Sequence, residues 1–527
     1  MITSHIQDLH LGPILVIVAI VLFLYLLYNK YCYGLNHIPG PLLACCTDLW
    51  RLRQAKNRRP ELAHMMLHEK HGSLVRIGPN SVSVSDPAAI PIIYALNSGF
   101  VKSDFYAVQQ TLSKGTRLFT LFTSLDERFH ARLRRAVSNA YAMSTLVQFE
   151  KYIDSTTIAF LDQMKARFAD KPQSRCNLSA WLQWYAFDVI GELTFSKRLG
   201  FIDGGEDVEG VIQSIENMFD YAAVVGQIPF LDNIFLKNPV RIMLSKYGLI
   251  NANTFMVDFA RKRLAERADL QNTDTEEAMK RRSYVRNDFL SRFLSAQEKD
   301  PDFITSDRVL ALTVANIFAG SDTTAISLRA VFYFLLKNPS TMQELMAELW
   351  EQKRLGHFKR SDGLVDWDEA RDLPYLGAVI KEALRCHPAV GLTLERIVPP
   401  QGVVVCGQFI PGGTIIGCSA WTVHRDAKTF GEFPEEFRPS RWIHASKEQK
   451  RIMDNSLFAF GAGSRTCIGK NISLLEMYKF IPSLLMAFEL SLADPSGEWT
   501  LHNAWFVKQT DFDVELRLRK RDGIELN

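Results

Sequence analysis

The sequence lacks any paired arrangement of its cysteines. Eight cysteines are scattered over 527 residues, with no C-x-x-C pair and no regular spacing. This excludes the dense disulfide framework of small secreted domains and argues against a structural zinc site, whose ligands come in close pairs. Neither charge sign is in large excess, because the net charge is only +3. We therefore expect no nucleic acid as a partner.

One stretch near the N-terminus has no charge at all. Residues 9–29 contain no Asp, Glu, Lys or Arg and are mostly apolar, and about 20 apolar residues span a bilayer as a helix. A cleaved signal peptide is the alternative, but it would have basic residues before the apolar run, whereas here Asp8 precedes it and Lys30 follows. We predict an uncleaved, single-pass anchor with the bulk of the chain in the cytosol, so that the sequons at Asn177 and Asn471 stay unused.

The rest of the chain shows no internal repeat and no linker that would divide residues 40–527. Two prolines around Gly40 favour a stiff, extended hinge after the anchor. Periodicity and composition then predict the following segments: short strands at 74–77 and 81–84 (the second alternating in period two), mainly helices over 126–355 with a strongly apolar run at 309–336, a polar loop or solvated helix at 263–288, and short strands and turns at 398–416. The predicted fold class is mainly α with small β-sheets.

The most informative segment is a glycine-rich loop around one cysteine. Glycines at 461, 463 and 469 allow backbone conformations that other residues avoid and let the chain approach a flat ligand closely. Cys467 lies among them and precedes a helical pattern at 471–488, so backbone N–H groups and a helix N-terminus can lower its pKa and favour the thiolate that binds metals. An ordinary buried cysteine is the alternative for such a loop taken alone.

The full spacing of this loop resembles the cytochrome P450 family. Phe460, Gly463, Arg465, Cys467 and Gly469 match all fixed positions of its F-x-x-G-x-R-x-C-x-G signature. The resemblance implies that the cofactor is heme b (iron protoporphyrin IX), that the Cys467 thiolate is the axial iron ligand, and that Phe460 packs beside its sulfur. A thiolate ligand pushes electron density onto the iron and favours cleavage of the O–O bond.

A second motif of the family precedes the loop. Glu382 and Arg385, at i and i+3 on one helix face, can pair, although a solvated surface pair is the usual reason for such spacing. The family's third member is an arginine in a P-x-R-W/F box, which Arg441 supplies, with Ser440 where the family usually has Glu. We expect the Glu382–Arg385–Arg441 cluster to be structural.

A third motif lies inside the most apolar helical run. Residues 319–324 read Ala-Gly-Ser-Asp-Thr-Thr, and an acid with hydroxyls is costly to bury there unless it is hydrogen-bonded or functional. A helix-kinking hydroxyl cluster is the alternative. By resemblance, Gly320 leaves room for dioxygen, while Thr323 and Asp322 help to deliver protons to it.

The remaining family positions concern the haem carboxylates. His130 and Arg134, at i and i+4, project from one helix face. The resemblance assigns them, with Arg396 and Arg465, to the haem propionates. Arg132 and Arg135, on the other side of that helix, are a solvated face or a docking site for an acidic partner.

The resemblance implies a monooxygenase that inserts one oxygen atom from dioxygen into a lipophilic or aromatic small molecule. The chain shows no flavin-binding glycine motif, so electrons are expected from a separate NADPH-cytochrome P450 reductase. The predicted division is a membrane anchor at 1–30, a linker with the proline-rich hinge at 31–59, and a haem-binding monooxygenase domain at 60–527, held at the endoplasmic reticulum membrane.

The substrate pocket is expected along residues 105–122, 218–235, 314–323, 389–394 and 504–507. Its expected apolar lining consists of Phe105, Tyr106, Phe119, Phe122, Phe318, Leu392, Trp505 and Phe506, unless these side chains are simply core. In overall style the chain is similar to fungal enzymes of the pisatin-demethylase type, which suggests hydroxylation, demethylation or epoxidation in secondary metabolism. Two alternatives stay open: a reductase-independent haem-thiolate isomerase or dehydratase, and a non-catalytic membrane haem-binding protein.

Overall fold

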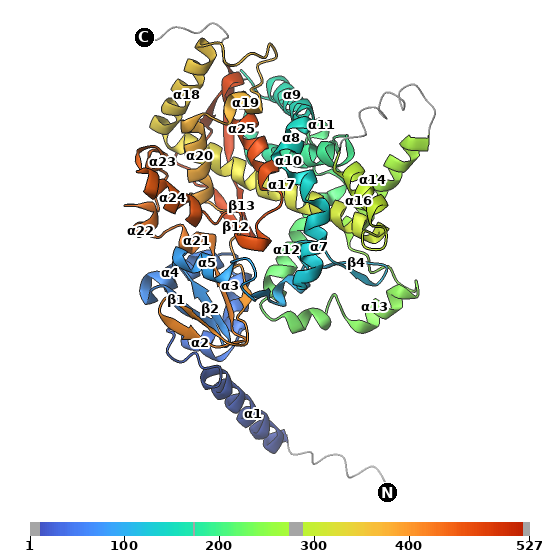
Figure 1. Ribbon diagram of the computed structural model, residues 1–527, viewed down its shortest axis with the longest axis vertical. Coiled ribbons are helices and arrows are strands. Elements are labelled where there is room, and N and C mark those ends of the chain that lie inside the picture. Colours follow the sequence, from blue (N-terminus) through green and yellow to red (C-terminus); the bar gives the residue numbers. More distant parts are fainter. Residues whose placement is uncertain (1–10, 172–173, 273–287, 520–527) are drawn as a thin grey trace.

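The computed structural model describes residues 11–171, 174–272 and 288–519. Helices form most of the molecule, and small β-sheets lie mainly in its lower left part in Figure 1. The predicted fold class, mainly α with small sheets, is therefore confirmed. The longer helices are α4 (Pro60–His71), α7 (Glu127–Val137), α9 (Glu150–Arg167), α10 (Leu178–Phe195), α12 (Val211–Val225), α14 (Phe255–Asn272), α16 (Phe289–Lys299), α17 (Ser306–Lys337), α18 (Pro339–Arg354), α20 (Pro374–Cys386), α24 (Lys447–Ser456) and α25 (Lys470–Ala487).

Helix α17 is the central element of the core. It corresponds to the apolar run predicted at 309–336 and packs against α10, α14, α16, α20 and α25. Its composition would also suit a membrane span, but 72% of its most apolar window is buried inside the protein. Burial against five helices removes that apolar surface from water, so α17 is a core helix.

The largest sheet has five strands in the order β1-β2-β10-β7-β3. These strands are β1 (Leu74–Gly78), β2 (Ser81–Val84), β10 (Ile415–Cys418), β7 (Arg396–Ile397) and β3 (Val101–Lys102). The strands predicted at 74–77 and 81–84 are thus confirmed, but all four residues of β2 are buried, whatever their polarity. The reason is that β2 lies between two strands and is covered on both faces, which period-two patterning does not reveal.

Smaller sheets complete the fold. The segment predicted as strands and turns at 398–416 forms the hairpin β8 (Val403–Val405) and β9 (Gln408–Ile410), followed by β10. A three-stranded sheet has the order β11 (Phe488–Leu492), β14 (Asp513–Leu518) and β6 (Cys176–Asn177). Two further two-stranded sheets pair β12 (Thr500–Ala504) with β13 (Phe506–Thr510), and β4 (Thr111–Ser113) with β5 (Thr116–Leu118). Of the polar segment predicted at 263–288, residues up to 272 belong to α14, and 273–287 lie outside the described residues.

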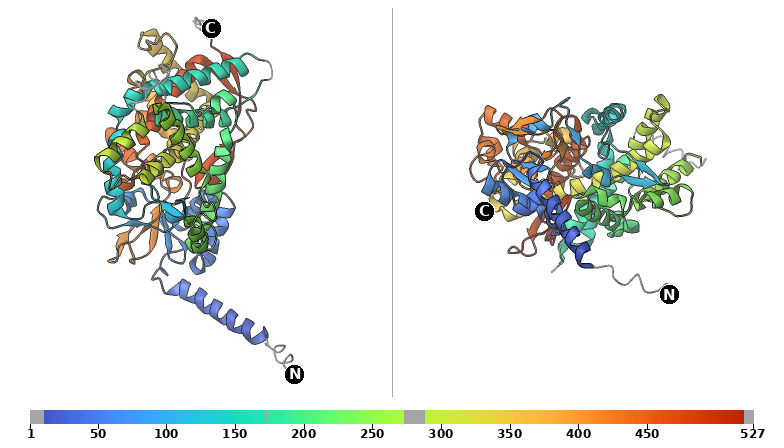
Figure 2. Two further views of the ribbon diagram at one scale, coloured as in Figure 1. Left: turned by 90° about the vertical axis from the view of Figure 1, so that its right-hand side faces the viewer. Right: turned by 90° about the horizontal axis from the view of Figure 1, so that it is seen from below.

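Helix α1 (Leu11–Tyr31) projects from the lower end of the body, and its apolar side chains are exposed (Figures 1 and 2). Pro13–Tyr31 has the length and hydropathy of a membrane span. Arg76 on β1 is buried and donates to the carbonyl oxygens of Asn29 (2.7 Å) and Lys30 (2.9 Å) at the end of this helix. The segment predicted as a linker carries α2 (Leu42–Cys46) and α3 (Leu49–Lys56), which contact β1.

Candidate active site

The loop that carries Cys467 is shaped by its glycines. Gly461 (φ 66°) and Gly463 (φ 65°) both adopt the left-handed conformation that side chains disfavour. A Cβ on Gly463 would lie 1.6 Å from the backbone oxygen of Tyr94, so only glycine fits there. The backbone N–H of Cys467 donates to the carbonyl of Phe460 (2.9 Å), which closes the loop around the thiol.

The Cys467 thiol is accessible although it lies deep in the protein. The N–H groups of Gly469 and Lys470, at the start of α25, donate to the sulfur as the sequence predicts. Burial nevertheless outweighs these donors and raises the pKa of the thiol, contrary to the expectation of a lowered value. The physical reason is that removing a thiolate from water costs more than two N–H donors return. A bound cation would supply the missing stabilisation.

One face of α17 has accessible surface in the middle of this otherwise buried helix. Ala315, Ala319 and Thr323, spaced four residues apart, are exposed or half-buried. Tyr141 lies between α17 and the cysteine: it donates to the buried Asn316 of α17 (2.5 Å), and its pKa is raised by burial and, more weakly, by the Cys467 thiol. The middle of α17 and the cysteine loop are therefore both neighbours of Tyr141 in the interior.

The predicted acid–hydroxyl pair is divided between two sides of α17. The Thr323 hydroxyl donates to the carbonyl of Ala319 (2.7 Å), on the accessible face. Asp322 is buried and accepts a hydrogen bond from Gln183 of α10 (2.6 Å). Gln183 in turn accepts one from Arg329 (2.9 Å). Burial raises the pKa of Asp322 above its ordinary value, because the charged form loses contact with water.

Gly320 is half-buried and lies where α17 meets α10. A Cβ on this residue would lie 2.8 Å from the side chain of Ile190 on α10. The absence of a side chain at Gly320 therefore lets α10 approach α17 closely, and the room for dioxygen at this glycine stays a prediction. The sequence motif did not reveal this because the contact depends on how two distant helices cross.

A group of basic side chains gathers between α7, the cysteine loop and the sheet. His130 is buried, its Nδ1 has no hydrogen-bond partner among the described residues, and its pKa is lowered to about 3 by burial and by nearby cations. Arg134 donates to the carbonyl of Thr466 in the loop (2.8 Å). Arg396 donates to the hydroxyl of Tyr106 (3.4 Å). These residues come from segments far apart in sequence, and the fold brings them together.

Two further residues belong to this group: Arg465, whose carboxylate partner the sequence did not predict, and Lys102, which the sequence did not predict at all. Arg465, predicted at a haem carboxylate, is held by the carboxylate of Glu127 (2.7 Å). Lys102 was missed: it is buried, its pKa is held well below the usual range by burial and by Arg396 and Arg465, and β3–β7 pairing places it directly opposite Arg396. Like charges opposite one another destabilise a sheet unless an anion lies between them. The site therefore fits a ligand with two carboxylates, as haem has.

The predicted aromatic lining forms two groups. Trp505, between β12 and β13, lies against Phe105, Tyr106 and Phe122, with ring centroids 5.2–6.1 Å apart. Around Phe219 of α12 lie Phe318 of α17 (6.0 Å) and Phe506 (4.8 Å). Phe119 instead contacts Phe129, and Leu392 is buried. Phe105, Tyr106, Leu392 and Trp505 are almost inaccessible, so they are core as much as lining.

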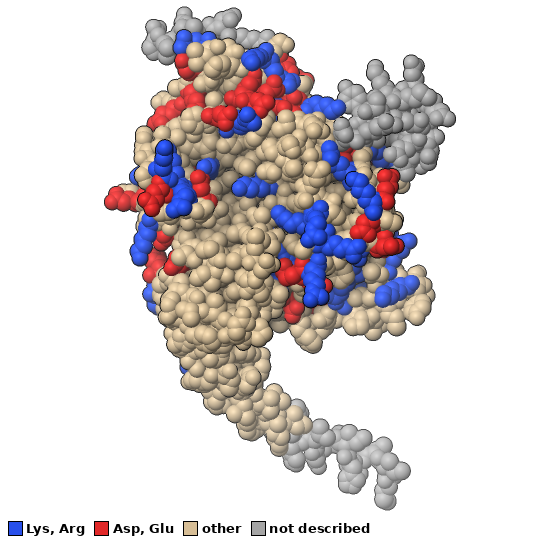
Figure 3. Space-filling model, in the orientation of Figure 1, with Lys and Arg blue, Asp and Glu red and all other residues tan. Residues whose placement is uncertain are grey.

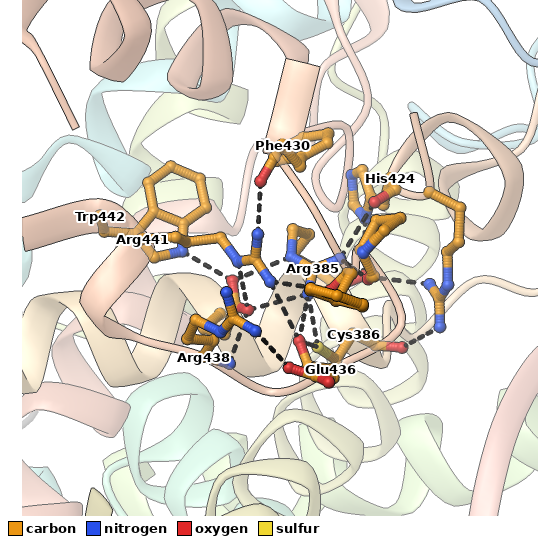
Figure 4. Close-up of polar contacts among 12 residues, drawn as sticks. Arg385, Cys386, His424, Phe430, Glu436, Arg438, Arg441 and Trp442 are labelled. Carbon is orange, nitrogen blue, oxygen red and sulfur yellow. Dashed lines mark hydrogen bonds and ion pairs between the residues drawn. The ribbon is translucent and has the colours of Figure 1, made fainter. Parts of the chain in front are cut away.

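The pair predicted on α20 is buried and forms the centre of a network (Figure 4). The carboxylate of Glu382 accepts from Arg385 (2.8 Å), Arg441 (2.7 Å) and the Trp442 indole (2.8 Å). Arg385 also donates to the carbonyl of His424, whose Nε2 accepts from the N–H of Phe458 (2.7 Å). The network thereby fixes the chain that leads into the cysteine loop, and His424 is a member that no sequence signal indicated.

A helical protein with an accessible cysteine in a glycine loop, a cationic site for two carboxylates and an acid–hydroxyl element on its central helix has the features of the haem-thiolate class. The sequence model described as "Cytochrome P450" matches residues 39–512. The chain belongs to the cytochrome P450 family. It is a monooxygenase, and its cofactor is haem with an axial cysteine thiolate, as throughout that family.

Fungal proteins are similar over almost the whole chain. A "Cytochrome P450 monooxygenase" of Aspergillus terreus is 43% identical over 90% of this chain and 95% of its own length. "Cytochrome P450 monooxygenase cicH" of Emericella nidulans is 41% identical over 93% of this chain and 95% of its own. "Cytochrome P450 monooxygenase mpaDE" of Penicillium brevicompactum is 39% identical over 95% of this chain, but only 57% of that longer protein is matched.

Proposed function

We propose that the chain uses dioxygen to hydroxylate, demethylate or epoxidise a lipophilic or aromatic small molecule, with Cys467 as the axial iron ligand. The observation that carries this proposal is the accessible Cys467 thiol at the start of α25, a helix that packs against α17, whose own middle has an accessible face. The bound haem supplies the oxygen activation. Phe460 lies in the same loop as the thiol, with the ammonium of Lys470 over its ring at 5.7 Å.

The group of basic side chains is proposed to hold the haem carboxylates. Burial and neighbouring positive charge lower the pKa of His130, Arg134, Arg465 and Lys102, and Arg396 is one of the neighbouring charges. An anionic ligand relieves that repulsion and gives the unpartnered nitrogen of His130 a hydrogen-bond acceptor. The Glu127 carboxylate orients Arg465 from the opposite side.

Electrons are proposed to come from NADPH-cytochrome P450 reductase at the surface of α7. P450 monooxygenases generally use a separate redox partner, and in Figure 3 basic side chains gather over the region where α7 lies. Arg128, Arg132 and Arg135 of this helix are exposed. Such a surface favours an acidic partner and accelerates its association.

The cellular setting is proposed as secondary metabolism at the endoplasmic reticulum membrane. Residues 1–30 serve as the single-pass anchor, 31–59 connect it to the body, and 60–527 form the cytosolic catalytic domain. The exposed Leu42, Leu43 and Leu49 beside α1 suit contact with the bilayer surface. Trp505 and the aromatic rings around it suit an aromatic or lipophilic substrate.

The function is tested with the full chain reconstituted with the reductase in lipid vesicles. Lipophilic compounds are first selected by the shift they cause in the haem spectrum and are then incubated with NADPH and isotopically labelled dioxygen. The proposal expects a product that carries one labelled oxygen atom and forms only when NADPH is present. A product that forms without NADPH, or without label, would reassign the chain as an isomerase or dehydratase.

Thr323→Ala is expected to uncouple NADPH consumption from product formation. The Thr323 hydroxyl lies on the accessible face of α17, and a positioned proton donor contributes on the order of 100-fold or more to such steps. We expect NADPH use to continue while product per NADPH falls about tenfold or more. The measurement is the ratio of product to NADPH consumed, by chromatography and absorbance.

Ser321→Ala is the matched control for Thr323→Ala. Ser321 makes the same kind of hydrogen bond, to the carbonyl of Ile317 (2.8 Å), but it is fully buried. Its loss should leave coupling unchanged. Equal coupling in the Thr323→Ala variant and the unmodified chain would exclude the proposed proton-delivering role.

A further inference from the structure

A pocket lined by both apolar and basic side chains lies outside the candidate active site. It has a volume of about 360 Å³ and lies between the β5 strand, the short helix η5 (Pro229–Asn233) and helix α13 (Pro239–Lys246). Its polar lining consists of Arg117, Asn233, Lys237, Lys246 and Tyr247. No Asp or Glu lines it among the residues that the structure describes.

The pocket carries uncompensated positive charge. Lys237 is buried and neutralised, because its ammonium lies 2.7 Å from the carboxylate of Asp232 and also donates to the carbonyl of Val108 (2.8 Å). Arg117 donates only to the side-chain oxygen of Asn233 (3.3 Å), and neither Arg117 nor Lys246 has a carboxylate partner within the described part of the chain. Two cationic groups are therefore left to face an anion.

Backbone packing brings the segments that carry the two cations together. Gly115 (φ 67°), in the turn between β4 and β5, lies so close to α13 that an added Cβ would be 2.5 Å from the carbonyl oxygen of Ile242 and 2.8 Å from the Lys246 side chain. Arg117 follows in β5, on one wall of the pocket, and Lys246 ends α13 on the other. The walls are in contact, so the site is formed before any ligand binds.

The rim of the pocket is apolar and exposed. Phe230, Phe235, Val240 and Leu249 are each at least half accessible to solvent, and so is Tyr247 of the lining. Exposed apolar clusters of this kind mark membrane or protein contacts. Helix α13 lies toward the lower end of the body, the end from which α1 projects (Figures 1 and 2). The rim therefore lies on the side of the molecule that faces the membrane that α1 is proposed to span.

We propose that this pocket binds the phosphate of an anionic glycerophospholipid, with Arg117 and Lys246 on the phosphate oxygens and the exposed apolar rim among the acyl chains. A volume of about 360 Å³ is within the range of small-molecule sites. Basic side chains near an apolar membrane surface attract anionic lipids, and each contributes on the order of a fivefold gain in affinity. The site goes beyond the oxidation chemistry and rests only on α1 lying in a membrane.

The test uses the full chain in nonionic detergent and short-chain lipids. Dihexanoyl phosphatidylglycerol, dihexanoyl phosphatidylcholine and inorganic phosphate are titrated separately, and binding is followed by line broadening in phosphorus NMR. We expect phosphatidylglycerol to bind about tenfold or more tightly than phosphatidylcholine, and this preference to vanish in an Arg117→Gln/Lys246→Gln variant. Activity is not part of the readout, so the outcome is independent of the proposed reaction.

A double variant elsewhere controls for total charge. Lys428→Gln on α22 (Ala427–Phe430) and Lys447→Gln on α24 remove two exposed cations without touching the pocket. This variant should keep the lipid preference. An equal loss in both double variants, or no loss in the pocket variant with an unchanged melting temperature, would overturn the proposal. Inorganic phosphate that competes at the same concentration as the lipid would show a free-phosphate site and overturn the lipid assignment.

Discussion

Replacing Cys467 with alanine should abolish the absorption band that a thiolate gives in the reduced, carbon-monoxide-bound haem, and with it all NADPH-dependent product formation. The reason is that a methyl group cannot form the proposed iron–sulfur bond. The thiolate also supplies the electron density that favours O–O cleavage. The measurement is the difference spectrum of the purified full chain, together with product formation.

Cys406→Ala is the control for this experiment. Cys406 is likewise an exposed thiol, near the carboxylate of Asp86, but it lies between β8 and β9 and outside the cysteine loop. Its variant should keep both the band and the activity. A Cys467→Ala variant that is folded, as judged by circular dichroism, and still shows the thiolate band would place the iron on another cysteine.

Replacing Glu382 with glutamine should destabilise the protein by about 3–5 kcal/mol, because it leaves the buried Arg385 and Arg441 without their common carboxylate. Both partners of the Glu382–Arg385 pair are fully inaccessible to solvent, so no water compensates the loss. The His424 connection to Phe458 should loosen as well, and haem retention should fall with it. The measurements are the free energy of unfolding in urea and the fraction of haem retained.

The same variant should change the response to acid. Burial by itself raises the pKa of Glu382, but Arg385 and Arg441 outweigh burial and hold the pKa below its ordinary value. A carboxyl group whose pKa is lowered by folding stabilises the fold above its unfolded pKa of 4.5 and loses this contribution as the pH falls through the lower folded value. The unmodified chain should therefore lose stability in this acidic window, and Glu382→Gln should lack that component.

An exposed pair provides the matched control for Glu382. Glu351 and Arg354 on α18 have the same i,i+3 spacing and a 2.7 Å contact, but both side chains are well exposed. Solvent screens such a pair, so Glu351→Gln should leave the free energy of unfolding within experimental error. Equal destabilisation by the two variants would show that burial of the Glu382 network contributes nothing to stability.

Much of the site could be predicted because its motifs are local. The cysteine loop, the Glu382–Arg385 spacing and the Asp322–Thr323 dipeptide each lie within one short segment, whose geometry depends on neighbouring residues alone. The left-handed glycines at 461 and 463, and the N–H donors of Gly469 and Lys470 at the sulfur, follow the predicted pattern. The core helix α17 also follows from its apolar run.

The parts that could not be predicted depend on partners far along the chain. Burial of the Cys467 thiol, which reverses the expected direction of its pKa, is set by everything that packs around it. Lys102 meets Arg396 only because β3 pairs with β7. Gln183 reaches Asp322, and Gly320 meets Ile190, only because α10 crosses α17 closely.

The sequence by itself therefore determined the fold class, the order of the motifs and the residue types available for chemistry, since these depend on periodicity and on spacing within one element. Only the tertiary structure decided which way each side chain of α17 faces, which carboxylate holds Arg465 and where two cations remain without a partner beside α13. The reason is physical: charge, burial and hydrogen bonding are fixed by neighbours in space, and some of those neighbours, such as Gln183 for Asp322 and Glu127 for Arg465, are more than 100 residues away in the chain.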